Sequence, residues 1–208
     1  MTTSVLTKPV PNALPYRKLT VIEYDRMIDT GILMSGEPYE LIDGLIIHKD
    51  RSARGENPMT IGAEHMWGVS NLGRIGRNLD RFGCYIQTQG PVIMAKYHEP
   101  EPDGAVLVGT EDDYKLTKPT FREVSCVIEV ADSSLGYDRG TKLAIYAGSG
   151  IPQYILINLV DKVVEVYTQP KARAERYGQT KILRPGDAVA FSLPRGQVFE
   201  IPAKNLLP

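Results

Sequence analysis

The sequence has few cysteines and histidines and no long hydrophobic run. Its two cysteines, Cys84 and Cys126, both lie in apolar stretches, and its three histidines are far apart. This pattern matches no recognised zinc site and predicts buried free thiols. No apolar run reaches the roughly 18 residues that a membrane-spanning helix needs. No secretory signal is visible either, so we expect a cytoplasmic protein without a membrane partner.

The sequence also lacks an excess of charge of one sign. Its 24 lysines and arginines are balanced by 25 aspartates and glutamates, for a formal net charge of −1. This balance excludes a strongly basic nucleic-acid binder, so contacts with nucleic acid would have to be local or metal-mediated. Trp67 and the eleven tyrosines are scattered along the sequence. That scatter predicts no platform for stacking bases.

The 208 residues are 42% hydrophobic and 24% charged, which is ordinary for a globular protein. Pro9, Pro11 and Pro15 lie in a segment without periodicity, which predicts an extended arm over residues 1–19. We expect a single domain over residues 20–208. The arm and a β-rich tail offer surfaces through which a homodimer or a higher homo-oligomer could form.

Local signals predict a mixed fold. Thr20 and Glu23 have the spacing of a capping box and predict a helix that ends near Gly31. Asp43-Gly44 is the pair that a type I′ hairpin turn prefers. Two further helices are expected over residues 61–82 and 137–147, and strands over 39–42, 45–48, 84–88, 91–95, 104–108, 124–130, 153–159 and 163–168. This order predicts an α/β (α+β) fold with a mixed β-sheet flanked by helices and a β-rich C-terminal extension.

Three acids occupy positions where a carboxylate is costly. Glu129 lies in VSCVIEVAD, a run that is apolar on both faces and predicts a strand at the centre of a sheet. Glu40 lies in YELIDGLII, and Asp103 opens DGAVLVG. Lys142 follows early in a predicted helix, with apolar residues on its face. Buried charges require compensation, and three acids with one lysine are the inventory of a divalent-metal phosphodiesterase.

The chemistry of such a group favours a divalent cation. Converging carboxylates repel one another unless a cation or a proton intervenes. Oxygen ligands suit Mg²⁺ or Mn²⁺ rather than Zn²⁺. The cation would activate a water and neutralise phosphate charge, and a lysine would stabilise the transition state or orient that water.

Each of these residues also has a structural interpretation. Lys142 has the spacing to pair with Asp138, one helical turn before it. Glu129 could form an ion pair with a neighbouring Lys or Arg, and Asp103 could cap a turn. Glu40 could be a solvated glutamate at a sheet edge. The four residues together therefore argue more strongly than any one of them.

Several other residues have two interpretations. His65 is either a hydrogen-bonded core histidine or a group that supports the metal ligands. Gln89 is either a strand-end amide or a side chain that orients the lysine or the water. Arg74, Arg77 and Arg81 lie opposite the apolar stripe of the second predicted helix. They predict either a solvated face or phosphate contacts.

The segments EPDGAVLV, CVIEVADSS and YDRGTKLAIYAGSGIPQYILIN resemble the bacterial Uma-type family of putative restriction endonucleases. That family was formerly a domain of unknown function and belongs to the PD-(D/E)xK nuclease superfamily. The resemblance spans roughly residues 20–170 and implies a restriction-endonuclease-like fold. Pro102-Asp103 matches the Pro-Asp of the superfamily motif, and Glu129 matches its second acid.

The sequence departs from the superfamily motif at one position. Ala131 stands two residues after Glu129, where the motif has its lysine. The resemblance implies that Lys142 on the following helix has taken over this role. It also implies that Glu40 is the additional acid of the first strand and that the main-chain carbonyl of Val130 is a further metal ligand.

These observations lead to two functional hypotheses. The first is a Mg²⁺- or Mn²⁺-dependent endonuclease that hydrolyses phosphodiester bonds, with DNA as the expected nucleic-acid partner and RNA as the open alternative. The second is a non-catalytic binding or oligomer-forming protein that keeps the nuclease fold. The absent lysine at position 131 and the balanced charge favour the second, whereas Asp103, Glu129 and Lys142 favour the first.

Overall fold

The structure is a computed structural model that describes residues 16–49 and 62–208. These residues form two compact units. The smaller comprises residues 16–49 and 96–98, and the larger comprises residues 62–95 and 99–208. Most of the predicted arm lies outside the described residues. The single domain expected from residue 20 onward stays a prediction.

The smaller unit is organised by two local signals. Its elements are α1 (Val21–Asp29), β1 (Tyr39–Ile42) and β2 (Leu45–His48). The Thr20 hydroxyl accepts a hydrogen bond from the Glu23 N–H, and the Glu23 carboxylate accepts one from the Thr20 N–H. The capping box is thus confirmed. Asp43 and Gly44 have φ angles of 52° and 73°, as a type I′ turn requires, and β1 pairs with β2 in antiparallel orientation.

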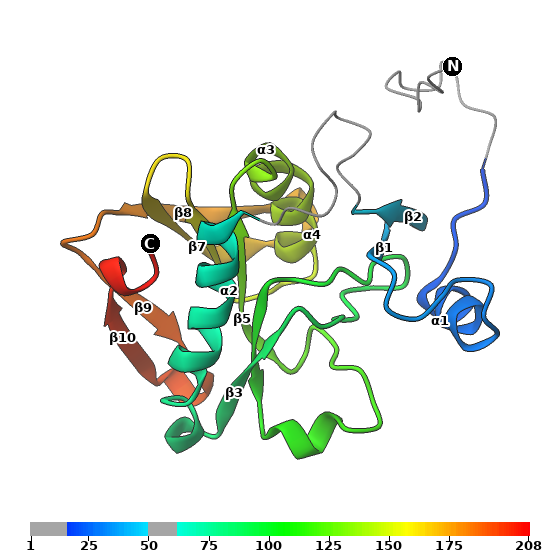
Figure 1. The fold of residues 1–208 in the computed structure, drawn as a ribbon, viewed down its shortest axis with the longest axis horizontal. Coiled ribbons are helices and arrows are strands. Elements are labelled where there is room, and N and C mark those ends of the chain that lie inside the picture. Colours follow the sequence, from blue (N-terminus) through cyan, green and yellow to red (C-terminus); the bar gives the residue numbers. More distant parts are fainter. Residues whose placement is uncertain (1–15, 50–61) are drawn as a thin grey trace. The chain divides into compact units, whose positions relative to one another are not determined.

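The larger unit is built on a six-stranded mixed sheet (Figure 1). Its strand order is β3 (Cys84–Thr88), β4 (Gly104–Val108), β5 (Val124–Ala131), β6 (Gln153–Asn158), β7 (Val163–Lys171) and β8 (Arg176–Leu183). β5 and β6 are parallel, and the other neighbouring pairs are antiparallel. Every residue of β5 is buried, as expected for a central strand. The predicted fold class is confirmed.

Helix α2 (Ala63–Gly76) packs on one face of this sheet, where the hairpin of β9 (Ala188–Ser192) and β10 (Val198–Pro202) adds to the same core. Leu72 and Ile75 of α2 join Ile128 and Val130 of β5 in that core. Burying each such side chain contributes about 1.5–3 kcal/mol to stability. A Cβ on Gly68 would lie 2.8 Å from Val130 Cγ1, so only glycine allows this close approach of α2 to β5.

A helical segment covers the opposite face of the sheet. It consists of α3 (Leu135–Tyr137), the π-helical turn η4 (Asp138–Lys142) and α4 (Leu143–Gly148). Because successive side chains of a strand alternate between faces, Glu129 points to this side and Ile128 to the other. The remaining helical elements of the described residues are short 3-10 turns, namely η2 (Asp80–Phe82), η3 (Glu111–Tyr114), η5 (Ala172–Ala174), η6 (Pro194–Gly196) and η7 (Ala203–Asn205).

The tyrosines are less scattered in space than they are in sequence. Tyr146, Tyr154, Tyr167 and Tyr177 form a buried cluster under α4, in which the rings of Tyr154 and Tyr167 stack at 5.6 Å. The alternation of β6 and β7 brings these side chains to one face. The cluster is part of the core, so it is no open surface for bases.

Three predicted elements differ from the structure. The strand expected over residues 91–95 is wrong, since only isolated bridges, at Ile93 and Ala95, form there; Pro91 lacks the N–H of a regular ladder. The second helix ends at Gly76 rather than at 82, and a separate 3-10 turn covers Asp80–Phe82. The third helix contains the π turn.

Both cysteines are buried free thiols, as predicted. No helix among the described residues is long and apolar enough to cross a membrane.

Candidate active site

Glu129 is the centre of a hydrogen-bond network on the covered face of β5. Its side chain is almost inaccessible, with the residue 3% exposed. Its Oε1 atom accepts hydrogen bonds from Lys142 Nζ at 2.9 Å and from the Tyr146 hydroxyl at 2.5 Å. Its Oε2 atom accepts a hydrogen bond from the Asp103 main-chain N–H at 3.3 Å. Both oxygens of this buried carboxylate are therefore engaged.

Asp103 lies directly before β4, next to Glu129. Its Oδ2 atom accepts a hydrogen bond from the Val130 N–H at 2.9 Å and lies 3.3 Å from His65 Nε2. The two acids are linked reciprocally, because the N–H of Asp103 binds Glu129 while the N–H that follows Glu129 binds Asp103. This arrangement fixes both carboxylates relative to the backbones of β4 and β5.

Lys142 reaches the acids from the last residue of the π turn η4. The residue is 6% exposed, and its amine pairs with Glu129. A buried ammonium group is costly unless a carboxylate compensates it. π-Helical turns inside helices frequently occur at functional sites. Its pairing with Glu129 shows that the Lys142 amine points toward the sheet and the acid pair.

The pKa values of the two acids shift in opposite directions. Burial raises the pKa of Glu129 to about 8; the charge of Lys142 opposes this rise, and those of Asp103 and Asp138 add to it. Burial is also the largest influence on the pKa of Asp103 and acts to raise it, but the contacts with His65, the Val130 N–H and the charge of Lys142 together outweigh it and the pKa is lowered. Two neighbouring acids whose pKa values are shifted in opposite directions are typical of catalytic or metal-binding sites.

The donor atoms fit a hard divalent cation. Asp103 and Glu129 would supply carboxylate oxygens, and Val130, which carries the further expected carbonyl, directly follows Glu129 in sequence. Among the residues that the structure describes, no group of three or more His, Cys, Asp or Glu side chains could hold a metal. Mg²⁺ usually keeps several water ligands beside one or two carboxylates, so two acids and a carbonyl suffice. A cation would also offset the burial that raises the pKa of Glu129.

Glu40 and Gln89 are placed differently from these residues. Glu40 belongs to the smaller unit, where it is 2% exposed and its Oε1 lies 3.4 Å from Lys49 Nζ. Its interpretation as a solvated edge residue is therefore wrong, and its membership of the site stays a prediction. The main-chain N–H of Gln89 donates to the Asp103 carbonyl at 3.3 Å. Within the described residues, the exposed Gln89 side chain forms no hydrogen bond.

Tyr146 belongs to the hydrogen-bond network of Glu129, and sequence reasoning assigned it no role. The signal was its position four residues after Lys142, because residues one helical turn apart share a face. An aromatic residue on the apolar side of a helix is ordinary core material. Only the structure shows its hydroxyl on Glu129.

A second polar group attaches the π turn to the sheet. Arg139 Nε donates to both oxygens of Glu165 on β7 at 3.1 Å, and Arg139 Nη2 lies 3.3 Å from an Asp161 oxygen. Glu165 is buried and also accepts a hydrogen bond from Asn158 at 2.9 Å. Since Arg139 precedes Lys142 by three residues, this contact holds the turn that carries the lysine.

Comparisons with known proteins agree with this arrangement. The Uma2 family model, described as "Putative restriction endonuclease", matches residues 22–202. A crystal structure of a putative nuclease belonging to DUF820 from Anabaena variabilis ATCC 29413 is similar, with 18% sequence identity and a TM-score of 0.63 over 90% of this chain and 97% of that chain. No curated protein matches the sequence. The structural likeness shows that the two proteins share a fold.

Proposed function

Because the chain belongs to the Uma2 family of putative restriction endonucleases, we propose that it is a metal-dependent endonuclease acting on nucleic acid, with DNA as the first candidate. The observation that carries the proposal is the buried Lys142 amine on Glu129, beside the fixed carboxylate of Asp103. A lysine, two acids and a main-chain carbonyl form the inventory of a PD-(D/E)xK site.

Asp103, Glu129 and the Val130 carbonyl would hold Mg²⁺ or Mn²⁺. The bound cation would supply an activated water and neutralise charge on the phosphate. Lys142 takes the role of the lysine that Ala131 replaces in the strand. Its ammonium group stabilises the negative charge that develops on the phosphate oxygens, or orients the attacking water. Water displaces the 3′ oxygen in line and leaves a 5′-phosphate, as the superfamily resemblance implies.

Neighbouring residues position this machinery. His65 holds the Asp103 carboxylate, and Tyr146 shares the Glu129 oxygen that binds Lys142. Restricting these side chains to one geometry is itself a catalytic contribution, since misplacement of reacting groups by about 1 Å is costly. Glu40 would bind or position the cation or its water, and Gln89 would orient the lysine or the water.

Cleavage assays test the proposal directly. Supercoiled plasmid, single-stranded DNA and RNA are incubated with the native protein in Mg²⁺, Mn²⁺ or EDTA. We expect metal-dependent cleavage, and a fall in rate of about 10²–10³-fold in Glu129→Gln and Lys142→Ala, because each removes a charged group from the transition state.

Lys181→Ala is the matched control, since Lys181 is an exposed lysine of β8. It should cleave like the native protein. Product that is equally abundant in Glu129→Gln, Lys142→Ala and the native chain would come from a contaminating nuclease and would contradict the proposal, as would no product at all.

A second candidate is a non-catalytic protein that keeps the fold and binds nucleic acid or further copies of itself. Ala131 in place of the strand lysine is the observation that favours it. This candidate predicts binding or self-association without cleavage. Sedimentation of the full chain would determine whether homodimers or larger oligomers form.

A further inference from the structure

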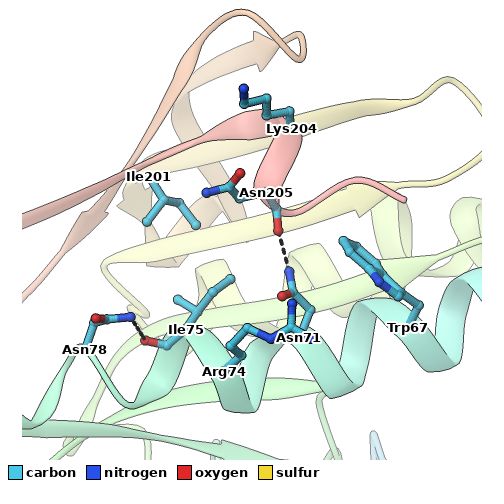
Figure 2. A pocket seen from close by; sticks show the side chains of 8 residues that line it. All are labelled: Trp67, Asn71, Arg74, Ile75, Asn78, Ile201, Lys204 and Asn205. Atoms are coloured by element: carbon cyan, nitrogen blue, oxygen red, sulfur yellow. Dashed lines mark hydrogen bonds between the residues drawn. The ribbon is translucent and has the colours of Figure 1, made fainter.

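A cleft of about 370 Å³ lies in the larger unit, between α2 and the C-terminal segment. Figure 2 shows its walls. One is formed by Trp67, Asn71 and Arg74 of α2, and the other by Ile201, Lys204 and Asn205. None of the residues that line the cleft is acidic. It is distinct from the acid pair, to which none of these side chains belongs.

The cleft has a fixed floor. The buried Asn71 amide donates a hydrogen bond to the Asn205 main-chain carbonyl, which attaches the C-terminal segment to α2 (Figure 2). Ile75 and Ile201 are also buried and line the cleft. A hydrogen bond from a buried side chain to the main chain holds the walls at a set separation.

The rim of the cleft carries uncompensated positive charge and an open aromatic ring. Arg74 and Lys204 are exposed, and within the described part of the chain neither forms an ion pair. Trp67 is 37% exposed. The protein as a whole has a net charge of −1, so two cations without ion pairs in the same cleft as a tryptophan form a local exception. Proteins that bind single-stranded nucleic acid combine cations, which contact the phosphates, with aromatic rings, on which the bases stack.

We propose that this cleft binds an unpaired stretch of the nucleic-acid substrate, with phosphates on Arg74 and Lys204 and a base stacked on Trp67. The inference rests on the proposed nuclease function and names where the strand lies outside the acid pair. The scatter of aromatic residues in the sequence predicts no platform of several rings, and the proposal needs only the one ring of Trp67. The exposed ring acquires a role through the two cations that line the same cleft.

Helix α2 connects this cleft to the acid pair. His65, in its first turn, contacts Asp103, and Arg74 follows nine residues later. At about 1.5 Å per residue this separation is about 14 Å along the helix. With bases stacked about 3.4 Å apart, the bond to be cut would lie about four nucleotides from the phosphate bound by Arg74.

Binding without cleavage tests the inference. Fluorescence anisotropy is measured with labelled single-stranded and duplex oligonucleotides on the full chain carrying Glu129→Gln, in EDTA. In this background we expect Arg74→Gln with Lys204→Gln to weaken single-strand binding and to lower the slope of log K against log salt by about 1.4, since each phosphate contact contributes about 0.7. Trp67→Ala should weaken it by about 5- to 100-fold, and Trp67→Phe should retain most of the affinity.

Lys181→Gln in the same background is the control and should leave affinity and slope unchanged. The inference is overturned if the Arg74 and Lys204 double variant keeps the native slope, if Trp67→Ala binds like Trp67→Phe, if only duplex is bound, or if no nucleic acid is bound. The proposed function fails separately. A chain that binds single strands through the cleft but never cleaves them would retain the inference and lose the nuclease activity.

Discussion

At the scale of single residues, the site depends on how one carboxylate divides its two oxygens. Glu129 gives Oε1 to Lys142 and Tyr146 and Oε2 to the Asp103 N–H. Oε1 accepts hydrogen bonds from a charged amine and a hydroxyl, whereas Oε2 accepts one long hydrogen bond from a main-chain N–H. Oε2 is therefore the atom that can be turned toward a cation at the smaller cost.

Tyr146→Phe tests this division of roles. The Tyr146 hydrogen bond lowers the pKa of Glu129, so its loss should raise that pKa further above about 8. We expect cleavage at pH 7 to fall by about 3- to 10-fold, as for one lost hydrogen bond, and to recover partly at higher pH. Rates measured from pH 6 to 9 give the profile.

Tyr85→Phe, on the edge strand β3, is the matched control for this profile. It should have the native pH dependence. If Tyr146→Phe shows the same loss at every pH, the hydroxyl only packs, and it does not act through Glu129.

At this scale, sequence reasoning could select residues that the structure brings into contact where their burial was unambiguous. Asp103, Glu129 and Lys142 could be selected because an ionised group in an apolar run needs a partner. Tyr146 could not be selected in the same way, because an aromatic residue on a helix face satisfies the ordinary packing rule by itself. The partner of His65 was also beyond reach, since Asp103 lies just before β4, nearly forty positions later in the sequence.

At the scale of elements, the π turn η4 and its anchor to β7 determine where the lysine lies. Burial acts to raise the pKa of Glu165, but Arg139, Tyr167 and Asn158 outweigh it, so the pKa is lowered from 4.5. A carboxyl group with a depressed folded pKa stabilises the fold above its unfolded pKa. That contribution is lost as the pH falls from about 4.5 through the folded value.

Glu165→Gln should therefore reduce stability at pH 6 by about 1–2 kcal/mol, because Arg139 is partly exposed and water replaces some of the lost interaction. The deficit relative to the native chain should shrink as the pH falls below 4.5. Urea unfolding midpoints at pH 6, 4.5 and 3.5 measure it. Glu200→Gln, at an exposed position of β10, should show no such convergence. A deficit that is constant with pH would mean that the charge of Glu165 does not contribute.

Elements whose signals lie within a few residues could be predicted from sequence, and those that depend on the chain's surroundings could not. The hairpin at Asp43-Gly44 and the capping box at Thr20 are local. The segment beginning at Pro91 has strand composition, but its main-chain groups pair elsewhere, as with Val92 N–H and the Pro100 carbonyl. A π turn leaves no periodic trace, because one extra residue disturbs a 3.6-residue repeat too briefly.

At the scale of the whole molecule, a bound cation should appear as stability. If Asp103 and Glu129 hold Mn²⁺ in the folded chain only, a concentration of 100 times Kd adds about 2.7 kcal/mol. For a chain of this length that is a rise in Tm of about 5–10 °C. Differential scanning fluorimetry with and without MnCl₂ measures it, and Asp103→Asn should abolish the rise.

Asp112→Asn is the control for this experiment, because Asp112 is an exposed acid of η3. It should keep the native response to Mn²⁺. An equal rise in the native chain and in Asp103→Asn would place the cation elsewhere and remove Asp103 from the ligand set.

The parallel pairing of β5 and β6 has a consequence for how such a site can change over time. Parallel neighbours need a crossover, and here the chain between them passes over the face to which Glu129 points. A side chain lost from the end of β5 can thus be replaced by one from the crossover without any change in the pairing of the strands. With this topology, a lysine can reach the same carboxylate from either of two elements, the strand itself or the crossover.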